Sequence, residues 1–363
     1  MGLSFFKHDT NIDFIGKRHY SYALSAILIL MGLFWTIYAG GPKMGIDFAG
    51  GVIVQVQFAQ PVDDEALKKS LDIPELPGIS TQRYGEGGRD YLLRFSSLEV
   101  DATQLRADVE QALGKTFPDN AAQIQRLELV GPKVGADLTN KALEAMFYAT
   151  LLIAVYISGR FEQRWMAAGI MAAALWGSMY ALSYTGLGMG WLVCFALLVT
   201  MGVCWKLRLN FALGAVVGLL HDVLITFGLL SMMGVEIDLN VVAALLTLVG
   251  YSLNDTIIVY DRIRENLKGT PEIPLMSIIN NSVNQTLSRT ILTSGTTFVA
   301  TLALYLLGGG VIHDFALTML IGVFVGTFSS VYVSSAVLLA MGDTAYYARE
   351  QVVYEKPGEH GVV

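Results

Sequence analysis

Eight apolar runs, each long enough to cross a membrane, constrain the fold of this chain more than any other feature. The hydrocarbon core of a bilayer is about 30 Å thick, so a spanning helix needs roughly 20 mostly apolar residues. The runs lie at residues 20–39, 141–159, 165–183, 190–205, 209–231, 239–260, 287–308 and 315–340. The sequence therefore predicts a polytopic α-helical membrane protein with about eight spans, the fourth of which is short.

Composition agrees with a membrane protein. Of 363 residues, 53% are hydrophobic and 15% are charged, whereas soluble domains are about a quarter charged. The formal net charge of −7 does not favour a nucleic-acid partner. Both cysteines, Cys194 and Cys204, lie in an apolar run, so we expect buried thiols and no disulfide, metal or cofactor site.

The first apolar run follows Lys17 and Arg18, as in a signal peptide, but no cleavage site follows it. The next residues, Gly-Gly-Pro-Lys at 40–43, lack the small-x-small pattern of a cleavage site. We therefore expect residues 1–41 to form a cytoplasmic N-terminus and an uncleaved first membrane helix.

Basic residues are distributed unevenly between the two sides of the predicted helices. The short loops at 184–189, 232–238 and 309–314 contain no Lys or Arg. The segments that face the opposite side carry Lys17, Arg18, Arg160, Arg164, Lys206, Arg208, Arg262, Arg264, Lys268 and Arg349. The positive-inside rule therefore predicts that both termini, including the tail at 346–363, lie in the cytoplasm.

Residues 42–140 contain no spanning run and have the pattern of a folded domain. Strand, helix, strand, strand, helix and strand are expected at 52–58, 62–71, 81–84, 91–95, 101–113 and 123–130. This βαββαβ order predicts one periplasmic domain of the ferredoxin-like α+β class.

The segment 261–286 has helical periodicity, although it is not apolar throughout. Its apolar residues recur at helical spacing, with Leu275, Met276, Ile278, Ile279, Val283 and Leu287 on one face. We predict a cytoplasmic amphipathic helix here that lies along the membrane face or against the other helices, within a helix bundle that extends over residues 141–345.

Three ionisable residues inside the predicted spans are candidates for function: Asp222, Asp255 and Arg289. A charge in the hydrocarbon costs about 2.5–3.5 kcal/mol even on the scale from insertion experiments, so such residues usually pair or line a water path. The structural alternatives are that either aspartic acid is protonated and hydrogen-bonded between helices, and that Arg289 reaches toward the lipid headgroups as an anchor.

Helix geometry separates these residues by depth. Asp255 lies about five residues, or roughly 8 Å, from the cytoplasmic end of its run, and Arg289 lies about one turn from the same side. Asp222 lies about 13 residues, or roughly 20 Å, from that side. We predict an Asp255–Arg289 pair whose separation drives proton uptake, with a lesser role for Asp222. Polar residues expected to support the pair are Tyr251, Ser252, Asn254, Thr293, Ser294 and Thr296.

Three motifs resemble the signatures of the SecF family, the smaller half of the SecDF accessory complex of the bacterial Sec translocon. They are GIDFAGG at 45–51, GYSLNDTIIVYDRIREN at 250–266 and TLSRTILTSGTT at 286–297, and the resemblance covers nearly the whole chain. It implies the resistance–nodulation–division superfamily, and use of the proton-motive force to help unfolded secretory proteins across the cytoplasmic membrane. It also implies SecD as an obligate partner, contacts with the SecYEG translocon and YajC, and Asp255 and Arg289 as proton-coupling residues, with a further intramembrane Asp from SecD.

One departure from the family pattern concerns the number of helices. The resemblance implies six, with an Arg-Phe-Glu turn leading directly into the helix that ends in His-Asp. Here Arg160-Phe-Glu162 is followed by about 40 additional residues before Lys206-Leu-Arg208 leads to His221-Asp222. We therefore predict an extra helical hairpin at about 165–205, which preserves the orientation of every later helix.

Two other functions fit parts of the pattern. A small-molecule exporter of the same superfamily would use the same kind of charged residues, but such exporters usually carry twice as many helices and two large domains. An intramembrane aspartyl protease would need Asp222 and Asp255 at one depth, in Gly-x-Gly-Asp and Tyr-Asp contexts that are absent at these positions. We expect no enzymatic activity. A neighbouring gene for a SecD-like chain would favour export of proteins, and one for a membrane-fusion protein would favour the small-molecule exporter.

Overall fold

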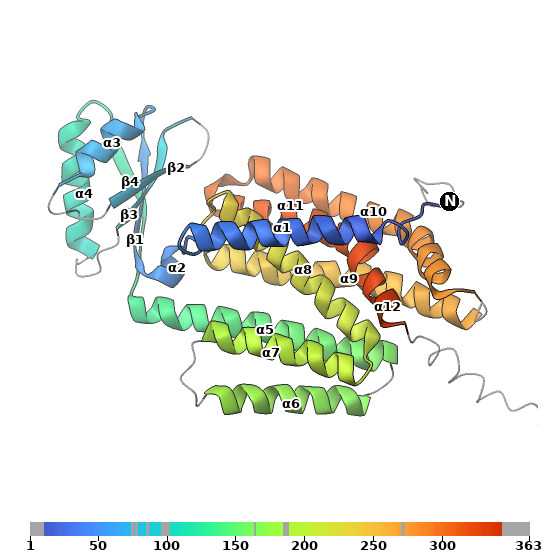
Figure 1. The fold of residues 1–363 in the computed structure, drawn as a ribbon. Helices are drawn as coiled ribbons and strands as arrows, with labels where there is room; N and C mark the ends of the chain where they lie inside the picture. Colours follow the sequence, from blue (N-terminus) through green and yellow to red (C-terminus); the bar gives the residue numbers. More distant parts are fainter. Residues whose placement is uncertain are drawn as a thin grey trace, which may run out of the picture.

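A small α/β domain stands at one end of a bundle of long helices (Figure 1). The structure is a computed structural model that describes residues 11–73, 76, 79–84, 87–95, 102–162, 165–183, 189–269 and 273–342. Helix α1 (Arg18–Tyr38) begins at the end of the bundle opposite the domain and reaches the domain with its last turn. We call these the basic end and the domain end, because the helices Pro132–Glu162, Met189–Lys206 and Leu239–Gly269 end at the first (Figure 1), and their last turns contain Arg160, Lys206 and Lys268.

Six helices within the described residues are long and apolar enough to cross a membrane. They are α1, α5 (Pro132–Glu162), α8 (Asn210–Met232), α9 (Leu239–Gly269), α10 (Leu275–Leu307) and the continuous helix Ile312–Met341. The last of these is made of α11 (Gly309–Ser329), the π-helical turn η1 (Ser330–Ser334) and α12 (Ser335–Met341). The prediction of a polytopic helical membrane protein is confirmed.

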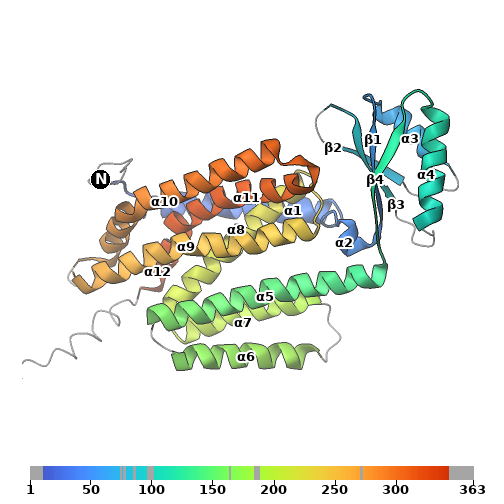
Figure 2. The same cartoon turned by 180° about the vertical axis from the view of Figure 1, so that it is seen from behind.

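The two remaining apolar runs form helices α6 (Trp165–Ser183) and α7 (Met189–Lys206), and α6 lies on the outside of the bundle (Figure 2). Both pack against α5, and their described apolar stretches are shorter than those of the six spans. Helix α7 packs through Val193 and Cys204, so the neighbouring Cys194 is exposed. The prediction that both cysteines are buried is therefore wrong for Cys194, and both are free thiols.

The domain contains a four-stranded antiparallel sheet with two helices on one face. In chain order its elements are β1 (Gly51–Phe58), α3 (Asp64–Leu71), β2 (Ile79–Tyr84), β3 (Asp90–Phe95), α4 (Ala102–Thr116) and β4 (Ala122–Val130). The strands lie in the order β2-β3-β1-β4, and each adjacent pair is antiparallel. The elements follow one another in the predicted succession.

Alternating residues of the central strands form the core of the domain. Val52, Val54 and Val56 of β1 are buried with Leu93 of β3 and Leu105 of α4. Because successive side chains of a strand point to opposite faces, the intervening residues of β1 face the bundle. They line a cavity of about 1020 Å³ between the sheet and the domain end of the helices.

The glycine-rich motif at 45–51 forms the turn between the bundle and the sheet. It contains the short helix α2 (Ile46–Ala49), followed by Gly50 and Gly51 with φ angles of 75° and 133°. A β-carbon added to Gly51 would lie 2.8 Å from the carbonyl oxygen of Phe95. Glycine is therefore required here for its backbone conformation and for the close approach of β3.

The same motif fixes the domain to the bundle. The backbone N–H of Gly45 donates to the carbonyl of Ile237, and the N–H of Ile237 donates to the carbonyl of Lys43, both at 2.8 Å. Phe48 of α2 is buried in a cluster with Leu230 of α8. The domain is thus attached to the loop that precedes α9.

The boundary between domain and bundle differs from the prediction. Helix α5 begins at Pro132 rather than at 141, so the domain ends at about residue 131 instead of 140. The first turns of α5 are charged and include an Asp137–Lys141 pair at 2.9 Å. Hydropathy alone does not detect a helix that extends beyond the apolar layer in this way.

The sequence predicts one amphipathic helix at 261–286, but the structure has no separate helix there. Helix α9 continues to Gly269 and α10 begins at Leu275, so the segment is divided between two long helices. Ile278, Ile279, Val283 and Leu287 are buried in the main core of the bundle, whereas Leu275 is partly buried and Met276 is exposed. The helical spacing was predicted correctly, and the residues pack against the chain itself.

Candidate functional site

Asp255 of α9 is buried against α10, with 2% of its surface exposed. Its Oδ1 accepts a hydrogen bond from Oγ1 of Thr293 at 3.3 Å, and its Oδ2 accepts one from Oγ of Ser294 at 3.2 Å. Ser294 Oγ also accepts a 2.7 Å bond from Oγ1 of Thr327 on α11. Asp255 therefore belongs to a line of hydroxyl groups that crosses three helices.

The sequence predicts an Asp255–Arg289 pair, but in the structure the two side chains are not in contact. Its side chain is exposed, one helical turn before Thr293 on α10, and no ion pair joins these two described residues. The hydroxyls of Thr293 and Ser294 make the contacts that the prediction assigned to the guanidinium, because they lie on α10 at the level of the carboxylate.

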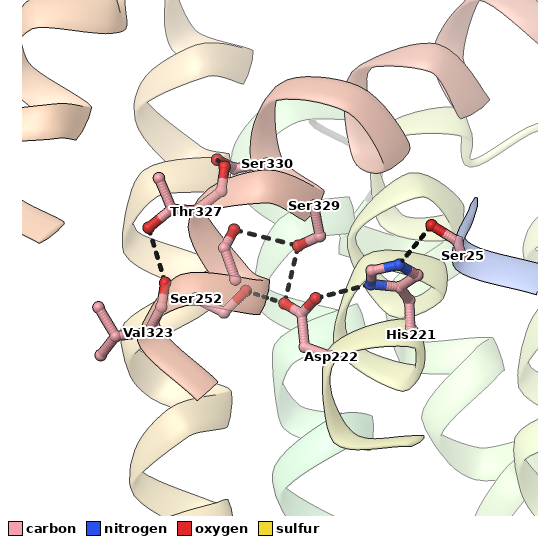
Figure 3. Close-up of polar contacts among 9 residues, drawn as sticks. Ser25, His221, Asp222, Ser252, Val323, Thr327, Ser329 and Ser330 are labelled. Carbon is pink, nitrogen blue, oxygen red and sulfur yellow. Dashed lines mark hydrogen bonds and ion pairs between the residues drawn. The ribbon is translucent and has the colours of Figure 1, made fainter. Parts of the chain in front are cut away.

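Asp222 of α8 is the centre of a second buried polar cluster (Figure 3). Its Oδ2 accepts hydrogen bonds from Oγ of Ser252 on α9 at 2.5 Å and from Oγ of Ser329 on α11 at 2.8 Å. Its Oδ1 lies 2.8 Å from Nδ1 of His221, whose Nε2 lies 2.8 Å from Oγ of Ser25 on α1. Asp222 thus connects α8 to α9 and α11, and the neighbouring His221 connects it to α1.

Three members of this cluster, Ser25, His221 and Ser329, were not predicted as site residues. A histidine beside an intramembrane aspartic acid is itself a signal, because both groups must find partners in an apolar surrounding. The serine pair at 329–330 within an apolar run is a weaker signal of the same kind. The link to Ser25 has no counterpart in sequence, because it depends on how α1 packs against α8.

The predicted supporting residues fall into two groups. Those that reach a buried carboxylate are Thr293, Ser294 and Ser252, but Ser252 bonds to Asp222 rather than to Asp255. Those that do not are Asn254, Thr296 and Tyr251. Asn254 and Thr296 are exposed, and the Tyr251 hydroxyl is buried without a hydrogen-bond partner in the described part of the chain.

The two carboxylates form separate sites. Within the described residues, the hydrogen bonds of Asp222 and Asp255 have no partner in common. A protease would need both carboxylates on one water, so this arrangement does not favour proteolysis. Nor do His, Cys, Asp and Glu side chains form a group of three that could hold a metal ion in the part of the chain described. Buried carboxylates among hydroxyls are suited to taking up and releasing protons.

Fold and site together define a multi-pass helical membrane protein with acidic side chains buried between its helices and an α/β domain at one end. The family described as protein export membrane protein SecD/SecF, C-terminal, matches residues 108–187 and 182–344, and the SecD/SecF GG motif matches residues 37–62. The chain belongs to the SecF family of protein translocase subunits.

Similar proteins cover nearly the whole chain. The protein translocase subunit SecF of Calditerrivibrio nitroreducens is 36% identical over 93% of this chain and 96% of its own. That of Magnetococcus marinus is 40% identical over 93% and 94%. The crystal structure of SecDF, a translocon-associated membrane protein from Thermus thermophilus, matches with a TM-score of 0.67 and 30% identity over 92% of this chain. This chain covers 39% of that longer one.

Proposed function

We propose that the chain is an accessory subunit of the Sec protein-export machinery that uses the proton-motive force, together with SecD, to promote translocation of secretory proteins. The observation that carries this proposal is the burial of Asp255 between α9 and α10, where its partners are two hydroxyl groups. An ionised carboxylate is costly in such a place, so its protonation state and the packing of the two helices depend on each other.

A partner that covers α10 fits this proposal. Of the six spans, α10 is the one least buried by the rest of the chain. Arg289 is on its exposed surface, beside the level of Asp255. We propose that SecD packs against α10 and places its own intramembrane Asp near Arg289. Contacts with SecYEG and YajC, and with unfolded secretory chains, are part of the same proposal and are tested by co-purification.

The proposed topology has eight spans, with α6 and α7 as the additional hairpin. Both termini and the basic end lie in the cytoplasm, and the domain is periplasmic and ferredoxin-like. Its support is the absence of Lys and Arg from the loops at 184–189 and 232–238, and the strand order β2-β3-β1-β4. Reporter fusions after Gly186 and Gly234 should report the periplasm, and fusions after Glu162 and Arg208 the cytoplasm. A cytoplasmic report after Gly186 would contradict the hairpin.

The test of function is export of a secretory precursor into inverted membrane vesicles under an imposed proton gradient. Asp255→Asn retains size and hydrogen bonding but cannot change its charge, so it should abolish the gradient-dependent increase. Asp261→Asn is the matched control, because Asp261 is on the same helix and pairs with Arg160 at 3.3 Å on the exposed surface. A sodium gradient in place of the proton gradient identifies the coupling ion. Extrusion of small molecules without any effect on precursor export would favour the exporter instead.

A further inference from the structure

A row of buried polar groups runs along α8 from the basic end of the bundle to Asp222. The positions of α8 that face it are Phe211, Gly214, Gly218 and Asp222. They recur every three or four residues and therefore share one face of the helix. At 1.5 Å per residue the row is roughly 16 Å long.

The row begins with a buried carboxylate at the basic end. Glu162, the last residue of α5, is buried and accepts a 3.0 Å hydrogen bond from the backbone N–H of Phe211 in the first turn of α8. The neighbouring Asn210 is also buried, and its Oδ1 has no hydrogen-bond partner among the described residues. Asn210 lines a cavity of about 380 Å³ together with Lys206 and Arg208. Asn210, which precedes the residue that Glu162 bonds, thus opens onto a space at the basic end.

The middle of the row consists of two hydroxyl groups. Tyr260 of α9 is fully buried, and its hydroxyl donates a 3.1 Å bond to the backbone carbonyl of Ser334. Its ring packs against Phe161, the neighbour of Glu162, and against Phe211, whose backbone N–H bonds Glu162. The Ser334 side chain is fully buried, and in the described part of the chain its hydroxyl has no partner.

Two glycines of α8 make room for these hydroxyls. A β-carbon at Gly214 would lie 2.3 Å from the Tyr260 hydroxyl oxygen. At Gly218 it would lie 2.1 Å from Oγ of Ser334. The Ser334 hydroxyl is therefore directed at the surface of α8, one helical turn from Asp222.

The π-helical turn η1 brings both of its ends onto the row. Ser329, directly before η1, donates to Asp222, and Ser334 at its end faces Gly218 (Figure 3 shows the Asp222 end). The hydroxyl of Ser335 donates a 2.8 Å bond to the carbonyl of Ser330, five residues earlier. Such turns inside an α-helix occur mainly at functional sites.

We propose that Ser334, Tyr260 and Glu162 form a proton path that connects Asp222 with the basic end of the bundle. A buried hydroxyl without a protein partner is normally satisfied by water. Successive levels of the row are one helical turn, or about 5–6 Å, apart, a distance that one water molecule bridges. The proposal rests on the proposed proton coupling and adds the route by which the proton leaves.

The transfer balances without any further reactant. Ser334 and Tyr260 each accept a proton on one side as they donate one on the other, so both end unchanged. The proton lost by Asp222 is taken up by Glu162, which passes it to water in the cavity beside Asn210.

The test is precursor export into inverted vesicles that contain the full chain and its membrane partners, with and without an imposed proton gradient. Tyr260→Phe removes one hydroxyl and keeps the ring that packs against Phe161 and Phe211. Ser334→Ala removes the other. The matched control is Tyr332→Phe, which is in η1 but packs against Phe14 and Phe328.

We expect Tyr260→Phe and Ser334→Ala each to lower the gradient-dependent increase in export by roughly tenfold or more, as loss of a positioned proton-transfer group does. Export without a gradient and membrane level should be unchanged, and Tyr332→Phe should behave like the unaltered chain. Ser334→Ala should keep its melting temperature, whereas Tyr260→Phe should lower it slightly because it removes the bond to the Ser334 carbonyl. Glu162→Gln should lose the increase, and Glu162→Asp should retain part of it.

Two outcomes overturn the path. One is a normal gradient-dependent increase in both hydroxyl variants. The other is an equal loss of export with and without the gradient, together with a lower melting temperature, which marks a packing role. If Asp255→Asn abolishes the increase while the hydroxyl variants keep it, the path is wrong and the proposed function stands. If Asp255→Asn also keeps it, the proposed function is wrong as well.

Discussion

Ser252 and Asp255 lie one turn apart on α9, yet Ser252 donates a 2.5 Å hydrogen bond to Asp222 of α8 while Asp255 is bonded to α10. One helix therefore serves two carboxylate sites. Movement of α9 relative to α8 would change the partners of Asp222, and movement relative to α10 would change those of Asp255, so both sites depend on the position of this helix.

Ser252→Ala should destabilise the protein by removing one donor from Asp222. Hydrogen bonds between membrane helices contribute about 0.6 kcal/mol on average and up to about 1.7 kcal/mol, and a bond to a carboxylate should be near the upper value. Thermal unfolding in detergent measures the effect. The control is Thr247→Ala, since the exposed Thr247 hydroxyl bonds only to its own helix at Ala243. In the Asp222→Leu background, which has no acceptor, the Ser252→Ala effect should shrink; full additivity would show that the bond contributes nothing.

Arg289 should be required for proton-coupled export, although it does not touch Asp255 in this structure. Of the three candidate residues Asp222, Asp255 and Arg289, only Arg289 is basic. Arg289→Met removes this positive charge and should abolish the gradient-dependent increase in export. Arg289→Lys keeps the charge without the planar fork and should be impaired less. The control is Arg262→Met, because Arg262 is exposed and pairs with Glu265 at 2.6 Å on the surface of α9. Normal export by Arg289→Met would leave Arg289 as a membrane anchor.

The sequence predicts this fold well where one physical signal decides the answer. Hydropathy locates the membrane helices, and strand alternation locates the sheet. It places boundaries poorly where a helix continues beyond the apolar layer, as at Pro132 and Gly269. Distance along a helix predicts different depths for Asp222 and Asp255, but it does not give the direction of a side chain. For that reason the partner of Ser252 and the missing Asp255–Arg289 contact could not be predicted.

The isolated domain, residues 44–131, should lose stability in acid through Asp64. A hydrogen bond from Tyr91 at 2.8 Å, and the Arg83 guanidinium at 2.8 Å, hold the pKa of Asp64 below its ordinary value. Because the native pKa is the lower one, the stabilisation is complete above the unfolded value of about 4 and is lost as the pH falls through the native value. The free energy of unfolding in urea should fall less between pH 7 and pH 3 for Asp64→Asn than for Asp72→Asn. Asp72→Asn is the control, because Asp72 is exposed and lies beyond the end of α3. Equal differences would exclude Asp64 as a source of the acid sensitivity.

The attachment of the domain should depend on Arg94 more than on its ion-pair partner Glu236. The two residues join β3 to the loop before α9. Burial lowers the pKa of Arg94, while Asp314 and Asp238 of the bundle act to raise it. Arg94→Glu would therefore place a carboxylate near those of Glu236, Asp238 and Asp314. In Glu236→Arg, Asp238 and Asp314 would still offset the positive charge of Arg94. Hydrogen exchange at the Gly45 and Ile237 amides should accelerate more in Arg94→Glu, and the double exchange should restore protection only in part. Arg106→Glu on the exposed surface of α4 should change nothing there.

Gly51→Ala should destabilise the isolated domain, whereas Gly114→Ala should stabilise it. Gly51 has a φ of 133° and its added β-carbon would lie 2.8 Å from the carbonyl oxygen of Phe95, so the substitution strains both the backbone and the β1–β3 pairing. Strained backbone positions of this kind cost about 1–3 kcal/mol. Gly114 is within α4 with no neighbouring atom inside 4 Å of the added β-carbon, and alanine in a helix is favoured over glycine by roughly 0.5–1 kcal/mol. Urea unfolding of the two variants, made by the same chemical change, should therefore shift in opposite directions. A stable Gly51→Ala domain with unaltered strand pairing would mean that the turn accommodates a side chain, and the glycine motif would then need another explanation.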